Sequence, residues 1–207
     1  MRYALDRKAQ THQRIAKEAS VRFRRDGIGA TGLQPLMKSL GLTHGGFYAH
    51  FKSKDDLVEQ ALKLAVDEAK ACTRETFTGP DSLSEFIDIY LSSPHRDEPG
   101  TGCPLPNMCA ELGQLNQPSP LTDEIIIHLL DAFDEAQQIE NPEPKSMLVL
   151  SSLVGALMLS RSVHDQQLSE HILKVTREHV KLHISKPDTA EVPLLQSTVA
   201  DEIPLST

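Results

Sequence analysis

The stretch RIAKEASVRFRRDGIGATGLQPLMKSLGLTHGGFYAHFKSKDDL, residues 14–57, decides the fold of this chain. Apolar residues in its first part recur three or four positions apart, which is the spacing of one buried helix face. They are Ile15, Ala16, Ala19 and Phe23. We therefore expect a helix over about residues 11–25, ended at Asp26-Gly27 by a glycine in the left-handed conformation.

Two shorter helices are expected next. Thr31 followed by Gln34 matches a capping box, in which the hydroxyl and the amide each satisfy a free backbone N–H. The apolar residues of this second helix are Leu33, Leu36, Met37 and Leu40, and it should end at Gly41. Thr43 can cap a third helix that reaches about residue 50. Short helices joined by a tight turn form a helix-turn-helix, whose second helix lies in the DNA major groove.

Charge is distributed unevenly along the chain. Residues 1–54 contain eleven Lys and Arg against three Asp and Glu, a balance of about +8, while the whole chain carries −8, so the remainder carries about −16. A basic segment on an acidic body is typical of a protein that binds a polyanion. Because the basic charge coincides with the helix-turn-helix, we interpret the polyanion as double-stranded DNA.

Helical spacing continues beyond this stretch, and the fold class predicted is all-α. Ser53 and the acids after it predict the start of a long helix over about 54–76. Further helices are expected near 81–92, 119–138, 145–163 and up to 185, with a short, broken one in 103–115 and a polar loop at 93–102. We divide the chain into a DNA-binding head (residues 1–53), a ligand-binding and dimerisation body (residues 54–186) and a free tail (residues 187–207).

The composition excludes several classes of protein. No apolar run reaches the 18 or more residues of a membrane span, and the N-terminus lacks the apolar core of a signal peptide, so we expect a cytoplasmic protein without a membrane partner. Three cysteines are too few for a disulfide framework. No nucleophile elbow, phosphate-binding loop or dinucleotide fingerprint occurs, so we expect no catalytic residues, no cofactor and no enzyme.

The residues of the first stretch together resemble the DNA-binding segment of TetR-type transcriptional regulators. The matching elements are Arg14-Ile15, Phe23, Gly27, Thr31, Gly41-Leu42-Thr43, Tyr48, Phe51 and Ser53-Lys54. The resemblance implies an all-α homodimer with an N-terminal three-helix head and a helical body that binds a small-molecule effector. It also implies repression, in which the effector shifts the spacing of the two heads and releases a palindromic operator.

The resemblance further implies roles on DNA for the residues of the head. Tyr48, His50 and Lys54 match phosphate-contacting positions, and the tip of the recognition helix meets base edges. The complete set of predicted DNA-binding residues is Thr31, Thr43, His44, Gly45, Gly46, Tyr48, His50 and Lys54.

Some of these residues have plainer alternatives. Thr43 can be a helix cap alone, and His50 can be a structural histidine at a helix end. Phe47 and Phe51 are expected in the core of the head, with contact to a thymine methyl as the alternative for Phe47. Other basic residues of the head are expected to act by long-range attraction; these are Arg22, Arg24, Arg25 and Lys38.

Adjacent glycines at Gly45 and Gly46 are unexpected, because each costs a helix interior about 1 kcal/mol relative to alanine. We interpret the pair as clearance at the DNA-facing tip of the recognition helix. On this interpretation, a Gly46→Ala change stabilises the head but alters operator affinity.

Cys103 is a candidate effector or sensor residue. It lies in GTGCPLPNMCAEL, residues 100–112, where a thiol near a helix start can have a lowered pKa. The Gly-Cys-Pro motif is similar to that of a TetR subgroup in which some members sense electrophiles or oxidants. The alternative is a small side chain that packs or lines a ligand pocket.

Two weaker interpretations complete the set. A thiol-dependent oxidoreductase using Cys103 with Cys109 would leave the basic head unexplained, and a nucleoid-type DNA binder would need no large acidic body.

His171, His179 and His183 share a helix, but we expect interface histidines there and no metal site.

Overall fold

The computed structural model describes residues 2–137 and 143–185, and every regular element in these ranges is a helix. The prediction of an all-α fold is confirmed. The elements are α1 (Arg2–Asp26), α2 (Leu33–Ser39), the 3₁₀ helix η1 (His44–Ala49), α3 (Lys54–Thr76), α4 (Ser82–Tyr90), α5 (Ser93–Asp97), α6 (Leu105–Gln114), α7 (Pro120–Gln137), α8 (Glu143–Ser162) and α9 (Gln166–Ser185).

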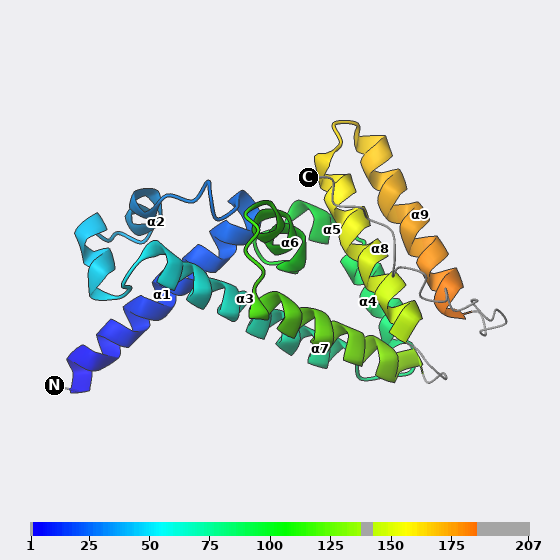
Figure 1. Ribbon diagram of the computed structural model, residues 1–207, viewed down its shortest axis with the longest axis horizontal. Coiled ribbons are helices and arrows are strands. Elements are labelled where there is room, and N and C mark those ends of the chain that lie inside the picture. The colour runs from blue at the N-terminus through cyan, green and yellow to red at the C-terminus, as the bar shows by residue number, and fades with distance from the viewer. Residues whose placement is uncertain (1, 138–142, 186–207) are drawn as a thin grey trace, which may run out of the picture.

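The head lies at one end of an elongated molecule, and α3 runs from it into the body (Figure 1). Its apolar core gathers the residues that the helical spacing placed on one face, with Phe47 and Phe51 fully buried among them. The first turns of α3 complete this core through Leu57 and Ala61. Because α3 contributes to the cores of both head and body, a boundary between residues 53 and 54 remains a prediction.

Glycines end the first two helices as predicted. Gly27 has φ +92° and its N–H donates to the Phe23 carbonyl oxygen, while Gly41 has φ +71°. Both conformations belong to the left-handed region that glycine adopts without a steric penalty. Ser53 caps α3, because its hydroxyl oxygen accepts a hydrogen bond from the Asp56 N–H at 3.1 Å.

The first helix begins earlier than predicted, at Arg2 rather than near Thr11. Thr11 was expected at the start, but its hydroxyl donates to the Arg7 carbonyl oxygen one turn earlier at 2.9 Å. A threonine can make this bond inside a helix, so its presence does not mark an N-terminus.

The capping box at Thr31 was a wrong prediction. The hydroxyl of Thr31 donates to the Gly27 carbonyl oxygen at 2.7 Å, and α2 begins one residue later, with Gly32 at the N-cap and no side-chain cap. In that register Pro35 occupies the third helical position and has no N–H, so one of the donors that a cap normally satisfies is missing.

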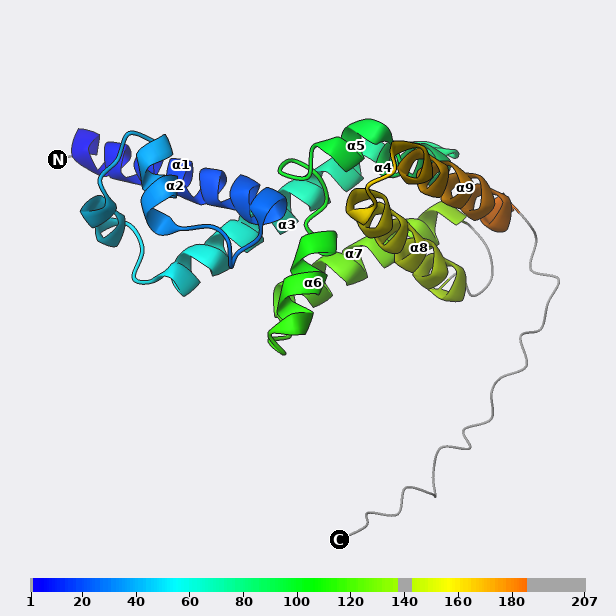
Figure 2. The ribbon, with the colours of Figure 1, turned by 90° about the horizontal axis from the view of Figure 1, so that it is seen from above.

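In the body, α3 packs against α4 and α7, and α8 packs against α7 and α9 (Figure 2). An aromatic cluster lies in its core, where the Phe133 ring centroid is 5.8 Å from that of Phe77 and 5.4 Å from that of Phe86. α8 and α9 form an antiparallel pair at the far end from the head (Figure 1).

The predicted loop at 93–102 contains the short helix α5, which the proline and glycine content concealed. Ser92 caps it, accepting a hydrogen bond from the His95 N–H at 3.3 Å, and Pro94 lies in its first turn, where a missing N–H costs nothing. The predicted tail, residues 187–207, lies outside the described residues. In the described ranges, no helix is both long enough and apolar enough to cross a membrane.

We predict that Gly27→Ala lowers the free energy of unfolding by about 2 kcal/mol, because an alanine at positive φ is strained. The new Cβ would also lie 2.8 Å from Oε1 of Glu111. Urea denaturation of both proteins measures the change. Gly79→Ala is the matched control, since a Cβ there meets nothing within 4 Å; equal effects of the two substitutions would contradict the prediction.

Candidate DNA interface and effector cavity

Four of the predicted DNA-binding residues lie at the start or on the outer surface of η1: Thr43, His44, Gly45 and Tyr48. Thr43 caps this helix, its hydroxyl oxygen accepting a hydrogen bond from the Gly46 N–H at 3.2 Å. His44 and Gly45 are exposed, and Tyr48 exposes 63% of its surface. The buried Phe47 supports the tyrosine, since the two rings meet edge to face at 5.2 Å. The structure thus presents a hydroxyl, an imidazole and bare backbone on one surface.

The two glycines differ in what surrounds them. A Cβ at Gly45 would meet nothing within 4 Å, whereas a Cβ at Gly46 would lie 3.3 Å from the Thr43 hydroxyl oxygen. Residues three apart eclipse one another on a 3₁₀ helix, so Gly45 shares a ridge with Tyr48. Gly45 is therefore the glycine that leaves open space on the outer surface of η1. The missing side chain at Gly46 instead leaves room for the capping hydroxyl of Thr43.

Thr31 and Lys54 both bind the connection between α1 and α2. Thr31 is buried, and its hydroxyl donates to Gly27 as described above. The Lys54 ammonium donates to the Ile28 carbonyl oxygen at 2.8 Å. An ammonium has three N–H donors, so this contact leaves donors for a phosphate.

His50 faces α1 and is half-buried. Its carbonyl oxygen lies 3.2 Å from Nδ1 of His12, whose ring stacks on Phe51 with centroids 4.3 Å apart. Burial, with a smaller effect from the neighbouring His12, lowers the pKa of His50. The neutral form is therefore favoured at neutral pH, so a contact from His50 to phosphate would use an N–H donor without a full positive charge.

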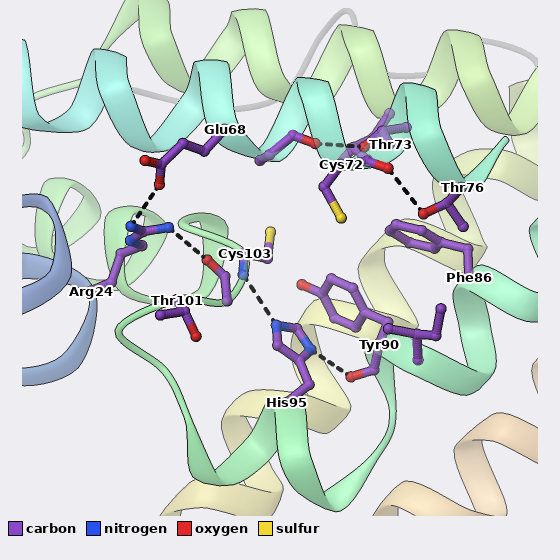
Figure 3. A pocket seen from close by; sticks show the side chains of 14 residues that line it. Arg24, Glu68, Cys72, Thr73, Thr76, Phe86, Tyr90, His95, Thr101 and Cys103 are labelled. Carbon is purple, nitrogen blue, oxygen red and sulfur yellow. Dashed lines mark hydrogen bonds and ion pairs between the residues drawn. The ribbon is translucent and has the colours of Figure 1, made fainter. Parts of the chain in front are cut away.

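A cavity of about 260 Å³ lies in the body beside the head (Figure 3). Its walls come from α3, α4, α5, α7 and the 101–103 segment, and its lining is mostly apolar. Side chains on its walls include Cys72, Phe86, Tyr90, His95 and Cys103. The last turn of α1 also reaches the wall, through Arg24.

Arg24 joins the head to this cavity. It exposes only 3% of its surface, and its guanidinium pairs with the Glu68 carboxylate at 3.0 Å (Figure 3). A second N–H donates to the Gly102 carbonyl oxygen at 3.2 Å, and others donate to Ser20 on α1 itself. We call Arg24, Glu68 and Gly102 the Arg24 junction.

A second connection runs from α6 to the head. The Glu111 carboxylate accepts hydrogen bonds from the N–H groups of Ile28, at 2.7 Å, and Gly29, at 3.1 Å. The Asn107 side chain also donates to the Arg24 carbonyl oxygen. The loop after α1 is thus held by α6, which follows the cavity-lining segment directly in the chain.

Sequence reasoning treated Arg24 as a generic basic residue and did not identify Glu111. The spacing in α1 did indicate that Arg24 is buried. Ala16, Ser20 and Arg24 lie four residues apart on one helix face, and all three are buried. Glu111 carried no such signal, since its partners lie 82 and 83 residues away in sequence.

Cys103 lines the cavity, but its thiol is not activated as a helix start would activate it. Burial raises the pKa of Cys103, and this effect outweighs the lowering by the neighbouring Tyr90 hydroxyl. The expected lowering is therefore wrong, because the side chain is partly buried in a mostly apolar cavity wall. Its backbone N–H donates to Nε2 of His95 at 3.1 Å.

An unpartnered apolar face covers α8 and α9. On α8, Met147, Leu148, Met158 and Leu159 are exposed around Gly155, where a Cβ would meet open space. On α9 the exposed apolar residues are Leu168 and Leu182, and His171 and His179 are exposed between them. Among the described residues, no three His, Cys, Asp or Glu side chains gather as a metal site would require.

Comparisons with known proteins agree with this arrangement. Residues 15–61 match the family described as bacterial regulatory proteins, tetR family. The HTH-type transcriptional regulator AcrR of Shigella flexneri is 32% identical over 85 residues, which cover 40% of this chain and 39% of that regulator. The match therefore spans well under half the length of this curated relative.

Solved structures extend the likeness of fold to most of the chain. A TetR transcriptional regulator from Chloroflexus aurantiacus superposes with a TM-score of 0.74 at 21% identity, covering 87% of this chain and 97% of that one. The reduced form of NemR from E. coli gives 0.68 at 17% identity, covering 84% and 96%. At these identities the likeness establishes the fold alone. The head, over residues 15–61, thus matches the tetR family of bacterial regulatory proteins, and the fold of most of the chain is that of solved TetR-type regulators.

Proposed function

We propose that this protein is a ligand-responsive repressor, which leaves a palindromic operator when a small molecule occupies the body cavity. One observation carries the proposal: the head helix α1 supplies Arg24 to the cavity wall. An occupant of the cavity therefore meets residues that hold the head in place. The protein has no catalytic role in this proposal.

The Arg24 junction gives the coupling a physical basis. The Arg24 guanidinium is buried, so loss of the Glu68 carboxylate would leave a buried cation without its counter-ion, which is unfavourable. An occupant that displaces Gly102 or Glu68 must therefore move α1 with them. The head can then take two positions, one with the cavity empty and one with it occupied. The ligand shifts the head only to the extent that its affinity for the protein differs between these two positions.

DNA recognition is assigned to the outer surface of η1. In this proposal Thr43, Tyr48 and Lys54 donate to phosphates, and His44 and Gly45 meet base edges. Thr31 positions the head, because its one hydroxyl proton is already donated to the Gly27 carbonyl oxygen. His50 contacts phosphate only through a ring N–H, and Gly46 maintains the cap. Phosphate contacts supply affinity and register, so most sequence preference is expected at His44 and Gly45.

The exposed face of α8 and α9 is proposed as the homodimer interface. Small residues let helices approach closely, and the large apolar side chains around Gly155 supply area to bury. A two-fold axis through this face makes the contact self-complementary and yields two heads for two half-sites. In this proposal the head (1–53) binds DNA, and the body (54–186) binds the effector and dimerises. The protein is proposed to act in the cytoplasm.

DNA binding tests the proposal as a whole. The full-length protein should shift and protect a palindromic segment in the DNA upstream of its own gene, and unrelated DNA should compete poorly. Equal affinity for all sequences at moderate salt would favour a nucleoid-type binder instead.

Gly45→Ala is expected to weaken operator binding about tenfold, because its Cβ would stand on the surface that approaches the bases. Unfolding stability should not fall, since a Cβ there meets nothing within 4 Å. Gly113→Ala, equally open but on α6 in the body, is the matched control. Operator affinity by electrophoretic shift checks both variants, and an unchanged affinity for Gly45→Ala would remove this glycine from the DNA interface.

Leu159→Glu is expected to convert the dimer to a monomer, because it places a carboxylate within the proposed apolar interface. Leu159 exposes 58% of its surface in the single chain, so the fold should tolerate the change. Ile127→Glu, at 57% exposure on α7, is the control. Sedimentation velocity distinguishes the outcomes, and a dimeric Leu159→Glu protein would place the interface elsewhere.

Cys103 should react with iodoacetamide at pH 7.5 roughly tenfold or more slowly than the exposed Cys72, because a raised pKa leaves little thiolate. Its rate should continue to rise with pH beyond the range in which an ordinary thiol has fully ionised. Mass spectrometry of labelled peptides measures both rates. Faster labelling at Cys103, with release of DNA, would instead support the thiol-sensing alternative.

A further inference from the structure

Tyr90 carries a polar group that the fold does not use. The residue exposes only 4% of its surface and lines the cavity from α4. Its hydroxyl has no hydrogen-bond partner of normal geometry, and it is the cavity-lining atom among the unpartnered buried polar atoms of the described residues. A buried hydroxyl without a partner costs about 1–3 kcal/mol, so its presence needs an explanation.

The neighbouring Cys103 thiol interacts with this hydroxyl but is a poor partner for it. Burial raises the pKa of Tyr90 well above its ordinary value, and the neighbouring Cys103 raises it further. Tyr90 therefore keeps its proton at neutral pH and is available as a donor. A thiol is only a weak acceptor, so an oxygen in the cavity would compete successfully for this O–H.

Other polar groups on the cavity wall are already engaged. His95 lies between the Tyr90 carbonyl oxygen, 2.7 Å from Nδ1, and the Cys103 N–H, 3.1 Å from Nε2 (Figure 3). Both contacts are satisfied by a neutral ring that donates at Nδ1 and accepts at Nε2, and burial lowers the pKa of His95 in agreement. The hydroxyls of Thr73 and Thr76 donate to the backbone of α3.

Charge at the cavity is balanced within the protein. Arg24 and Glu68 pair at the end next to the head, and Arg24 also bonds the Gly102 carbonyl oxygen. A charged ligand would have to break this pair or enter an apolar space without a counter-ion. The electrostatics therefore favour a neutral occupant.

Size and lining restrict the occupant further. The volume of about 260 Å³ lies below the ~300–1,000 Å³ of drug-sized sites, while an apolar cavity of about 150 Å³ already holds benzene. Phe86 and Tyr90 supply aromatic walls, with ring centroids 5.6 Å apart. One substituted ring fits this space and these walls.

We propose that the effector is a small neutral aromatic compound, of one ring with a single hydrogen-bonding oxygen, which is bound reversibly with that oxygen paired to the Tyr90 hydroxyl. This inference rests on the proposed function, because it names the ligand of the same cavity. Binding is non-covalent, and Tyr90 determines specificity for the oxygen.

Calorimetric titration of the full-length dimer with three probes of similar size tests the ligand class. The probes are 4-ethylphenol, ethylbenzene and 4-ethylbenzoate, which are neutral with an oxygen, neutral without one, and anionic. 4-Ethylphenol should bind most tightly, since it alone satisfies Tyr90 without carrying a charge.

Tyr90→Phe tests the residue. It keeps the ring and removes the hydroxyl, so the Kd for 4-ethylphenol should rise about three- to tenfold while that for ethylbenzene stays the same or falls. The thermal midpoint of the variant should be unchanged or higher, because an unsatisfied group has been removed. Thr122→Val is the matched control, since it deletes an unpartnered buried hydroxyl outside the cavity and should leave both affinities unchanged.

Two results would overturn the inference: no binding of 4-ethylphenol by the wild-type protein, or equal loss of 4-ethylphenol and ethylbenzene binding in Tyr90→Phe. Operator release separates this inference from the proposed function. If 4-ethylphenol binds through Tyr90 and the operator complex persists, the ligand class stands and ligand-driven release fails. If other compounds release the operator and 4-ethylphenol does not bind, release stands and this ligand class fails.

Discussion

The burial of Arg24 constrains how the head can sit on the body. A guanidinium cannot lose its charge in a protein, so it must be paired wherever it is buried. Its partners come from three parts of the chain: Ser20 on α1, Glu68 on α3 and Gly102 before α6. Moving Glu68 away leaves the buried cation without its counter-ion, and moving Gly102 away removes one of its hydrogen-bond acceptors. The head therefore moves together with its partners or takes up a second arrangement in which the charge is paired again.

The contacts of Arg24 also connect the head to the cavity. The segment 101–103 forms both a wall of the cavity and a partner of Arg24, and α6 begins directly after it. α6 then holds the loop after α1 through Glu111. Cavity, segment and head are in continuous contact, so no long pathway through the core is needed to connect them.

The sequence predicted the features that depend on contacts between residues close together in the chain, and it missed those that depend on distant ones. Ile15, Phe23, Leu36 and Phe47 were assigned to the core correctly, because helical spacing is a local property and each helix of the head follows the previous one closely. The Thr31 cap was wrong because a competing acceptor, the Gly27 carbonyl oxygen, is created by the turn itself. The role of Glu111 and the raised pKa of Cys103 follow from contacts made only in the folded chain, and no pattern of neighbouring residues contains them.

The two ends of the cavity differ in how completely the protein satisfies its own polar groups. At the end beside the head, Arg24 and Glu68 satisfy one another, so an occupant gains little there and acts mainly by displacing atoms. At the wall formed by α4, Tyr90 keeps an unused donor, so an occupant gains a hydrogen bond and an orientation. A ligand bound with its oxygen at Tyr90 would direct its apolar part toward the Arg24 junction. Its hydrogen bond would then form away from the head, and its effect on the junction would be steric. Affinity and regulatory effect would then depend on different parts of the ligand, so compounds that share the oxygen could bind equally well and differ in how strongly they displace the head.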